Sequence, residues 1–374
     1  MRKRLRVVVV TFDHAAVARA YFGRRRRSFV TPVARVRMTR TTVSRSVARA
    51  LACADVELTR ELALALALVT SRASSVGVEL RDENANAHPF VCAFAGDKSG
   101  GVIGAYVGER ANALGARERA NARDVRIVRS TARGVESIAS SARAYVARAL
   151  VEEAHARKGE RGDVARACEA FAVSEPSVAK RAREVFAKNP SARIDAFLTT
   201  EVERFMDVDE MLIARHVGRG DEASALVAAE WHADGPYRGW ARPHGVYAKT
   251  LEAYGRGAEA RDRARIALSA GAWWTMGANG TLLDEMKTMS GYAGRSAEDA
   301  RRTLDGADVA GVERGEAPLT KEALALKRAM ATLDAVAWGE INGWMDSRER
   351  VAEALADAGL RQVSEFVLHG LREE

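Results

Sequence analysis

The chain has 374 residues, of which 47% are hydrophobic and 29% are charged, and its formal net charge is +8 at pH 7. Many of the hydrophobic residues are Ala and prolines are few; because Ala, Leu, Arg and Glu favour helices, the composition predicts an all-α protein. No window approaches the roughly 18 consecutive apolar residues of a membrane helix. Three scattered cysteines argue against a disulfide framework and for a reducing compartment.

Residues 1–54 carry the basic charge. They contain 14 Lys and Arg residues and a single acid, Asp13, whereas the rest of the chain has 44 basic and 49 acidic residues. The segment is rich in Ser, Thr and Val, and its apolar run Val7–Val10 is too short for a secretory signal. This composition predicts a disordered organellar transit peptide over 1–54, and the alternative is a basic arm that contacts nucleic acid.

We predict a helical, partly disordered N-terminal region over residues 55–160. Leucines recur at three- and four-residue spacings between 55 and 78, which indicates a helix. Residues 79–104 break the pattern with two Asn, one Pro and four Gly, so a loop or poorly ordered linker is expected there. Residues 109–157 are rich in Arg and Ala and carry an apolar stripe from Val135 onward, which predicts a long helix.

We predict a helical domain over residues 161–374. Helix-capping residues such as Asp163, Ser174 and Thr320 each precede a stretch with apolar residues at helical spacing. About ten helices with short connections are expected, and short connections favour antiparallel neighbours.

The central feature of this domain is an internal repeat. Gly218-Arg219-Gly220-Asp221-Glu222-Ala223 recurs 37 positions later as Gly255-Arg256-Gly257-Ala258-Glu259-Ala260, with five of six residues identical. Each copy lies between two helix-like stretches, so the repeat predicts two tandem helix–turn–helix hairpins. Gly218 and Gly255 are expected in the turns, and Val227 and Ala264 inside or between the hairpins.

The second copy resembles a tetratricopeptide repeat (TPR). Tyr247 and Ala248 fall at that family's Leu-Gly pair, Gly255 at the glycine between its helices, and Ala260 at a small position of its second helix. The period of 37 residues differs from the family's period of about 34. The resemblance implies a TPR-like helical domain over residues 161–374, with antiparallel hairpins stacked as a short right-handed solenoid.

A second resemblance rests on several features together. An Arg-rich leader, the block Ala272-Trp273-Trp274-Thr275-Met276-Gly277 and the terminal Ala358-Gly359-Leu360-Arg361-Gln362-Val363 look like the TPR-like plastid proteins related to photosystem II accumulation. This resemblance implies a chloroplast location, with the mitochondrion as the alternative destination of the transit peptide. It also implies a role in the accumulation of a thylakoid complex.

No motif requires catalysis, a cofactor or a metal. Gly96-Asp97-Lys98-Ser99 lacks the Gly directly before Lys that a phosphate-binding loop needs. His216, His232 and His244 lack the paired spacing of zinc ligands. The six Trp residues, all between 231 and 344, are expected mainly in the hairpin core. The alternative is that one or two of those at unit ends line the groove, namely Trp231, Trp240, Trp273 and Trp274. We therefore predict no enzyme, with no catalytic, cofactor-binding or metal-binding residues.

These features predict a non-enzymatic scaffold or assembly factor in a plastid, which holds a peptide or helix of a partner protein in a helical-repeat groove. The candidate groove residues, on the first helix of each hairpin, are Met211, Arg215, Tyr247, Ala248 and Leu251. The alternative is an organellar RNA-binding repeat protein, motivated by the arginines of Arg117–Arg148. Nucleic acid is not the favoured partner, because no aromatic platform accompanies those arginines. Peripheral association with thylakoids stays open.

Overall fold

The computed structural model describes residues 51–52, 56–73, 87–96, 101–108, 125–237, 239–277, 280–307 and 319–369. The predicted transit peptide therefore lies outside the described residues, except for Leu51 and Ala52. The chain divides into a unit of residues 1–37 and a unit of residues 38–374, and all described residues belong to the second unit. Helices predominate in it, as the composition predicts, and none of the described helices is long and apolar enough to cross a membrane.

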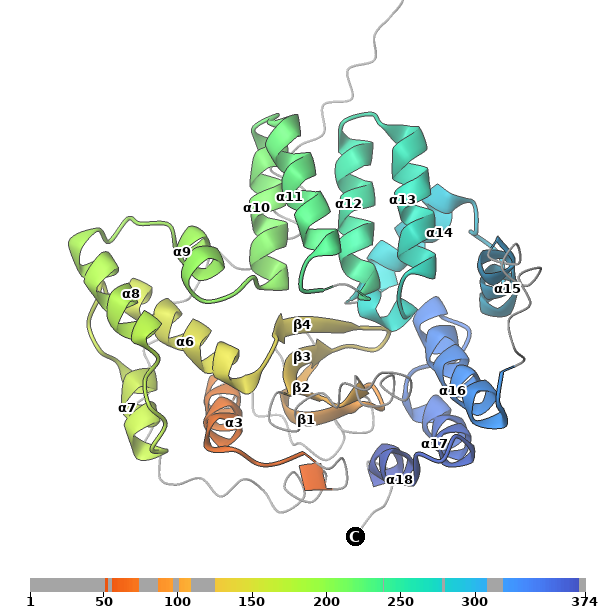
Figure 1. Cartoon of the computed structure of the whole chain (residues 1–374), viewed down its shortest axis with the longest axis horizontal. Coiled ribbons are helices and arrows are strands. Elements are labelled where there is room, and N and C mark those ends of the chain that lie inside the picture. Colours follow the sequence, from red (N-terminus) through yellow and green to blue (C-terminus); the bar gives the residue numbers. More distant parts are fainter. Residues whose placement is uncertain are drawn as a thin grey trace, which may run out of the picture. The chain divides into compact units, whose positions relative to one another are not determined.

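An antiparallel sheet of four strands, in the order β1-β2-β3-β4, lies among the helices (Figure 1). The strands are β1 (Val91–Gly96), β2 (Val102–Tyr106), β3 (Arg126–Ser130) and β4 (Val135–Ala139). The all-α prediction is thus wrong for the described part of residues 91–139, where a linker and the start of a long helix were expected. The helix of this stretch begins only at Ala142.

Gly104, one of the glycines that suggested a linker, is needed by the sheet. β1 pairs with β2 beside Gly104, where a Cβ atom would lie 2.2 Å from the Cys92 carbonyl oxygen, so only glycine permits this approach. In β4, Val135, Ser137 and Ala139 are buried at alternate positions, which is the period of a strand. Over only five residues the same apolar residues also fit a helical period, which is why the sequence pattern misled.

Five helices lie on one side of the sheet (Figure 1), namely α3 (Arg60–Ala73), α6 (Ala142–Ala156), α7 (Asp163–Ala170), α8 (Ser177–Lys188) and α9 (Ile194–Glu201). α3 confirms the helix predicted within 55–78, and it packs against β1 and α6. α7 starts without a capping side chain of its own. Instead, the Glu153 carboxylate of α6 accepts hydrogen bonds from the backbone N–H groups of Gly162, Val164 and Ala165 at 2.7–3.2 Å. This carboxylate satisfies the free N–H groups of α7 and ties α7 to α6.

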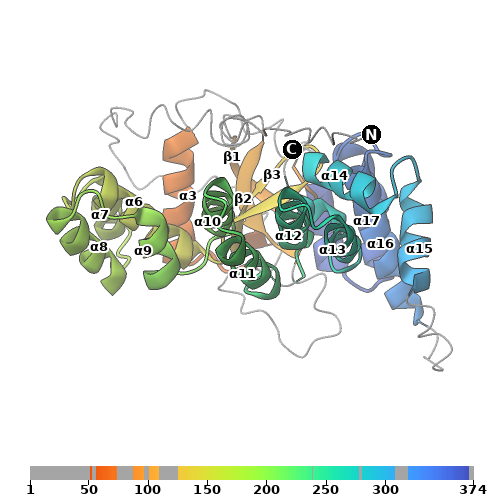
Figure 2. The same ribbon diagram turned by 90° about the horizontal axis from the view of Figure 1, so that it is seen from above.

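The internal repeat forms two antiparallel hairpins, as predicted. The first consists of α10 (Met206–Gly218) and α11 (Glu222–Asp234), and the second of α12 (Ala241–Ala253) and α13 (Gly257–Ser269). α10 and α12 lie beside each other in one layer, with α11 and α13 in a second layer (Figure 2). No longer solenoid is evident in the described residues, because the 3-10 helix η2 (Trp273–Met276) follows and packs against α12 and β4.

The structural period of the two hairpins is 35 residues rather than 37, since the first helices begin at Met206 and Ala241 and the second at Glu222 and Gly257. This register aligns Gly220 with Gly255, the two turn glycines, whose φ angles are 70° and 73°. Gly218 is the last residue of α10 and not the turn glycine that was predicted. The repeated hexapeptide is therefore offset by two residues between the hairpins.

The 35-residue register also explains which residues of the second helices are buried. Ala225 and Ala229 of α11 correspond to Ala260 and Ala264 of α13, and all four are buried. Small residues at these positions let neighbouring helices approach closely. Val227 is 56% exposed, so its predicted burial is wrong.

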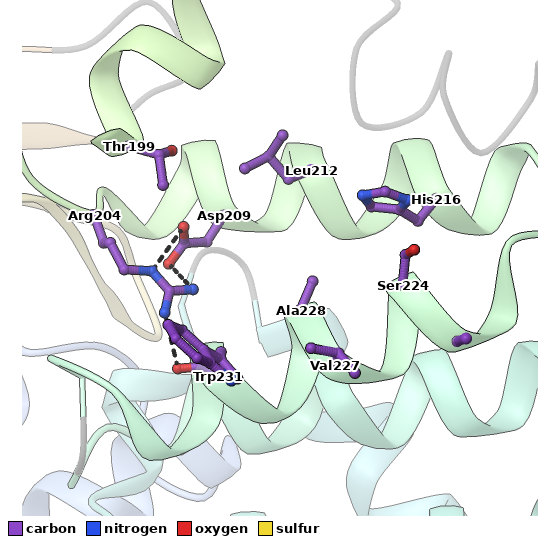
Figure 3. Close-up of a pocket in the computed structure, with 10 residues that line it drawn as sticks. Thr199, Arg204, Asp209, Leu212, His216, Ser224, Val227, Ala228 and Trp231 are labelled. Atoms are coloured by element: carbon purple, nitrogen blue, oxygen red, sulfur yellow. Dashed lines mark hydrogen bonds and ion pairs between the residues drawn. The ribbon is translucent and has the colours of Figure 1, made fainter. Parts of the chain in front are cut away.

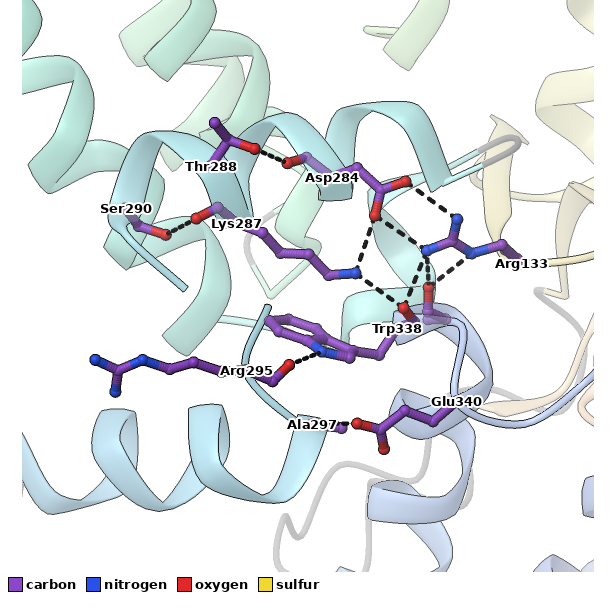
Figure 4. A network of polar contacts seen from close by, with 10 residues as sticks. Arg133, Asp284, Lys287, Thr288, Ser290, Arg295, Ala297, Trp338 and Glu340 are labelled. Carbon is purple, nitrogen blue, oxygen red and sulfur yellow. Dashed lines mark hydrogen bonds and ion pairs between the residues drawn. The ribbon is translucent and has the colours of Figure 1, made fainter. Parts of the chain in front are cut away.

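The remaining described elements are α14 (Thr281–Ser290), α15 (Ala297–Ala307), α16 (Lys321–Trp338), the 3-10 helix η5 (Met345–Ser347), α17 (Arg348–Asp357) and α18 (Arg361–His369). Arg133, in the turn between β3 and β4, connects α14 and α16 to the sheet (Figure 4). Its guanidinium donates to the carbonyl oxygens of Ala337 and Trp338 at 2.8–3.2 Å and pairs with Asp284 of α14 at 3.1 Å. Lys287 donates to the same Trp338 carbonyl at 2.8 Å. Two cations thus stabilise the negative end of α16.

The aromatic core lies around η2. Trp273 and Trp274 are fully buried there, and the Trp273 ring lies 4.2 Å from the ring of Trp338 in α16, measured between centroids. The Trp274 ring lies 5.3 Å from the buried His88 ring, which also contacts Trp344. Aromatic side chains from three separate parts of the chain therefore join the sheet to the C-terminal helices. The predicted burial of most Trp residues is confirmed, but they lie mainly around η2 rather than in the hairpin core.

Candidate functional site

A groove runs between α10 and α11 (Figure 3), and we call it the α10–α11 groove. Its volume is about 670 Å³, and most of its lining surface is apolar. The lining residues come from α9, from the loop before α10 and from the two hairpin helices: Thr199, Arg204, Asp209, Leu212, His216, Ala223, Ser224, Val227, Ala228 and Trp231.

α11 presents an apolar stripe to solvent along this groove. Ala223, Val227 and Trp231 follow one another at four-residue spacing and so share one face of the helix. Trp231 is 66% exposed, whereas the other five Trp residues are buried. Ile266, 40% exposed, takes the equivalent position on α13 in the 35-residue register. Neighbouring exposed apolar side chains mark interaction surfaces, so this face is the candidate site.

Arg204 forms one end of the groove. Its guanidinium pairs with the Asp209 carboxylate at 3.0 Å and donates to the Trp231 carbonyl oxygen at 3.3 Å (Figure 3). The same guanidinium lies 5.7 Å from the centroid of the Trp231 ring, within the range of a cation–π contact. The exposed indole is therefore held in place at this end of the groove.

Beneath the groove, two carboxylates of α10 enclose a buried imidazole of α11. His232 Nδ1 lies 3.3 Å from Asp209 Oδ2, and His232 Nε2 lies 3.8 Å from Glu210 Oε1, an ion-pair distance too long for a hydrogen bond. Burial alone would lower the pKa of His232, but the two carboxylates outweigh burial and raise that pKa above its ordinary value. When it is protonated, the imidazole pairs with both carboxylates and holds α11 against α10, the two walls of the groove.

Arg242 of α12 connects Glu210, which lies beneath the groove, to the sheet. It donates to both carboxylate oxygens of Glu210, at 2.6 and 2.9 Å, and to the Met276 carbonyl oxygen at 3.1 Å. It also lies 3.3 Å from Glu136 Oε1 of β4. Burial would raise the pKa of Glu210, but Arg242 and His232 hold that pKa at about 2, so the carboxylate stays ionised. Bidentate pairing of this kind fixes orientation, so the groove is formed before any partner binds.

The five residues that the sequence indicated for a groove do not lie together in this one. Three of them are half-buried at the surface, namely Met211, Arg215 and Tyr247. The other two, Ala248 and Leu251, are buried in the core and offer no surface to a partner. None of the five lines the α10–α11 groove. The sequence pattern indicated the first helices of the hairpins, but the exposed apolar side chains lie on the second helices.

Several of the arginines that motivated the RNA-binding alternative form contacts within the fold. Arg148 forms a bidentate pair with Asp207 at 2.7 and 2.8 Å. Arg129 pairs with Glu136 at 3.3 Å, and Arg126 lies over the Trp240 ring. They do not form a continuous basic helix, because Arg126 and Arg129 belong to a strand. Arg117 lies outside the described residues.

The three histidines considered for zinc have separate surroundings. His216 Nδ1 lies 3.2 Å from Asp221 Oδ2, His232 lies between Asp209 and Glu210, and His244 neighbours Arg263. Among the described residues, no group of three or more His, Cys, Asp or Glu side chains is arranged to hold a metal ion.

Residues 206–293 match the family model of the PAB middle domain. The matched segment begins at the first residue of α10 and ends just after α14, so it contains both hairpins and most of the groove. No solved structure matches the chain.

A relative of known name is the Arabidopsis thaliana protein called "Protein IN CHLOROPLAST ATPASE BIOGENESIS, chloroplastic". It is 30% identical to this chain over 250 residues, which are 66% of this chain and 70% of the relative. Because the relative is a chloroplast protein, the predicted chloroplast location is confirmed, and the expected link to plastid factors is supported. The TPR resemblance has no counterpart in these matches. At this identity and coverage, the chain belongs to the family of that Arabidopsis chloroplast protein.

Proposed function

We propose that the protein is a non-enzymatic factor in the biogenesis of the chloroplast ATPase, and that it holds a segment of a partner protein in the α10–α11 groove. The name of the Arabidopsis relative supports the process, since it describes a protein in chloroplast ATPase biogenesis. The observation that carries the proposal is the exposure of Val227 and Trp231 along a groove within the matched residues 206–293.

A groove between two helices suits a helical segment of another protein. A third helix laid along α10 and α11 would cover Leu212, Val227 and Trp231 at once, as amphipathic helices do in hydrophobic grooves. Full burial of such side chains contributes roughly 1.5–3 kcal/mol each, and Trp is prominent among the residues that dominate interface energies. The ion pairs beneath the groove support the proposal too, because a preformed surface loses little conformational entropy on binding.

The same proposal assigns roles to other parts of the chain. Residues 1–54 act as the transit peptide, residues 55–160 form the N-terminal region, and residues 161–374 carry the partner-binding domain. We choose the ATPase over photosystem II as the thylakoid complex, because the name of the relative points to the ATPase. Met211, Arg215 and Tyr247, which are half-buried, are candidates for a second contact on the layer of α10 and α12.

An Arabidopsis line that lacks the relative provides the test. We expect the full chain, expressed there, to enter chloroplasts and to restore the amount of assembled ATPase, measured on native gels. Trp231→Ala and Val227→Asp should enter chloroplasts equally well but leave the amount of assembled ATPase low. Leu324→Ala is the control, since it shortens a 49%-exposed apolar side chain on α16 and should restore the ATPase fully.

Two outcomes would contradict separate parts of this proposal. If the wild-type chain enters chloroplasts and the amount of assembled ATPase does not recover, the proposed role in ATPase biogenesis is wrong. If Trp231→Ala restores the ATPase as well as the wild type does, the groove is not the working surface.

A further inference from the structure

We infer that the occupant of the α10–α11 groove is a basic amphipathic helix of the partner protein, with Lys or Arg side chains beside Trp231. The inference rests on the proposed function, because it names the chemistry of the segment held in that groove. It follows from the distribution of charge around the apolar stripe of α11.

The exposed charged residues of α11 are all acidic. Glu222, Glu230 and Asp234 are exposed carboxylates, and α11 contains no Lys or Arg. Glu230 is three residues from Val227 and Asp234 is three residues from Trp231, so each carboxylate lies next to an exposed apolar side chain. Neither Glu230 nor Asp234 forms an ion pair with any residue that the structure describes, so both can pair with a cationic partner.

Two described cations, one that lines the groove and one on α10 beside it, already have carboxylate partners. Arg204 pairs with Asp209 at 3.0 Å, and Arg215 pairs with Asp195 at 2.5 Å. Arg219 is exposed, but it lies in the turn at the opposite end of α11 from Trp231. Among the residues that the structure describes, the negative charge without a counterion is therefore concentrated at the Trp231 end of the groove.

This distribution of charge disfavours other occupants. In a two-fold contact between copies of this chain, both copies would bring the same acidic residues, Glu230 and Asp234, to one interface. Nucleic acids and anionic lipid surfaces are negatively charged and would be repelled in the same way. A basic amphipathic helix matches both the apolar stripe and its acidic border, because opposed charges across an interface favour binding.

The length of the stripe defines the pattern of the partner helix. Ala223 and Trp231 are eight residues apart, which corresponds to about 12 Å along the helix axis. A partner helix would therefore face α11 over about two turns, with apolar side chains at helical spacing and basic residues on the flank beside Trp231.

Two synthetic peptides test the inference on the full-length protein. Each is an amphipathic helix of about 18 residues with the same stripe of Leu at helical spacing, and the flanking positions hold Lys in one and Glu in the other. We expect the Lys peptide to bind about tenfold more tightly than the Glu peptide, with an affinity that falls as salt is added. Titration calorimetry at low and high salt measures both effects.

Charge-reversed variants provide the matched comparison. Glu230→Lys combined with Asp234→Lys should invert the preference, so that the Glu peptide binds more tightly than the Lys peptide. Glu349→Lys combined with Glu353→Lys is the control, because it reverses two exposed carboxylates with the same four-residue spacing on α17. The control should keep the wild-type preference for the Lys peptide.

The outcomes separate this inference from the proposed function. Equal binding of the two peptides, binding of neither, or an unchanged preference after the reversal on α11 overturns the basic helix. If both peptides bind equally and Trp231→Ala abolishes the binding of both, the groove of the proposed function survives. If the Lys peptide binds Trp231→Ala as tightly as the wild type, the groove is the wrong surface and both proposals fall. A wild-type dimer that Trp231→Ala converts to a monomer would make a second copy the occupant and overturn the inference.

Discussion

The buried imidazole of His232 lies 3.3 Å from the Asp209 carboxylate, where α11 meets α10. Asp209 is also the partner of Arg204, whose guanidinium lies over the exposed ring of Trp231. The charge of His232 is therefore linked, through one shared carboxylate, to the side chain that forms the end of the groove.

This link makes the stability of the protein depend on pH. Burial lowers the pKa of His232, but Asp209 and Glu210 outweigh burial and raise it above the ordinary value of 6.5. A raised folded-state pKa contributes stability that is fully present below the unfolded-state value and is lost as the pH rises through the folded-state value. We therefore expect the free energy of unfolding, measured with urea, to decline as the pH rises above about 6.5.

His232→Gln isolates this titration. Burial lowers the pKa values of His88 and His244, so their contributions to stability are lost as the pH falls and do not explain a decline at higher pH. His232→Gln should be less stable than the wild type at low pH, and its free energy of unfolding should no longer decline as the pH rises above about 6.5. A decline that persists in His232→Gln would assign the titration to another group.

Arg133 allows a test of how the sheet holds the C-terminal helices. Arg133→Ala removes three hydrogen bonds to the carbonyl oxygens of Ala337 and Trp338 and the ion pair with Asp284. It should lower the free energy of unfolding by about 1–3 kcal/mol. Arg133→Lys should recover little of this, because Lys lacks the planar guanidinium that reaches several acceptors.

Arg328→Ala is the matched control for Arg133→Ala. It removes an ion pair with Asp357 in which both side chains are more than half exposed, and such pairs contribute about 0–1 kcal/mol. Equal losses in Arg133→Ala and Arg328→Ala, measured by chemical denaturation, would mean that the bonds to α16 do not stabilise the fold.

Ala260 tests the packing of the second hairpin. It is 1% exposed on α13, so Ala260→Leu should overpack the helix contact and destabilise the protein by about 1–3 kcal/mol. Ala258→Leu, at an exposed position of the same helix, should change stability by less than about 0.5 kcal/mol. An unchanged melting temperature in Ala260→Leu would place Ala260 outside a tight helix contact.

The hairpins could be predicted from the sequence because their signals are local. The turn glycines and the alanines of α11 and α13 lie within a few residues of the helices that they shape. The sheet could not be predicted, because contacts between distant residues stabilise it. Gly134 lies so close to Gly277 that a Cβ atom would be 2.2 Å from its carbonyl oxygen, and the Trp344 indole donates to the Thr131 carbonyl oxygen at 2.6 Å.

The groove escaped prediction for a related reason. α11 has apolar residues on all sides, so the sequence does not indicate which of them stay exposed after the helices pack. The 37-residue register also aligned Val227 with the buried Ala264, although the structure aligns Ala229 with Ala264. The acidic residues Glu230 and Asp234 were the available signal, because carboxylates beside Val227 and Trp231 indicate a solvent-facing surface.

The 35-residue register predicts which glycines tolerate alanine. Gly220 and Gly255 have φ angles of 70° and 73°, so alanine at either position should cost about 1 kcal/mol. Gly218 is helical and a Cβ atom there would meet nothing within 4 Å, so Gly218→Ala should be neutral or stabilise by up to about 1 kcal/mol. The repeated hexapeptide instead aligns Gly218 with Gly255 and predicts similar effects for these two. Thermal unfolding of the three single variants decides between the registers: a loss in Gly218→Ala as large as that in Gly255→Ala would favour the sequence register over the structural one.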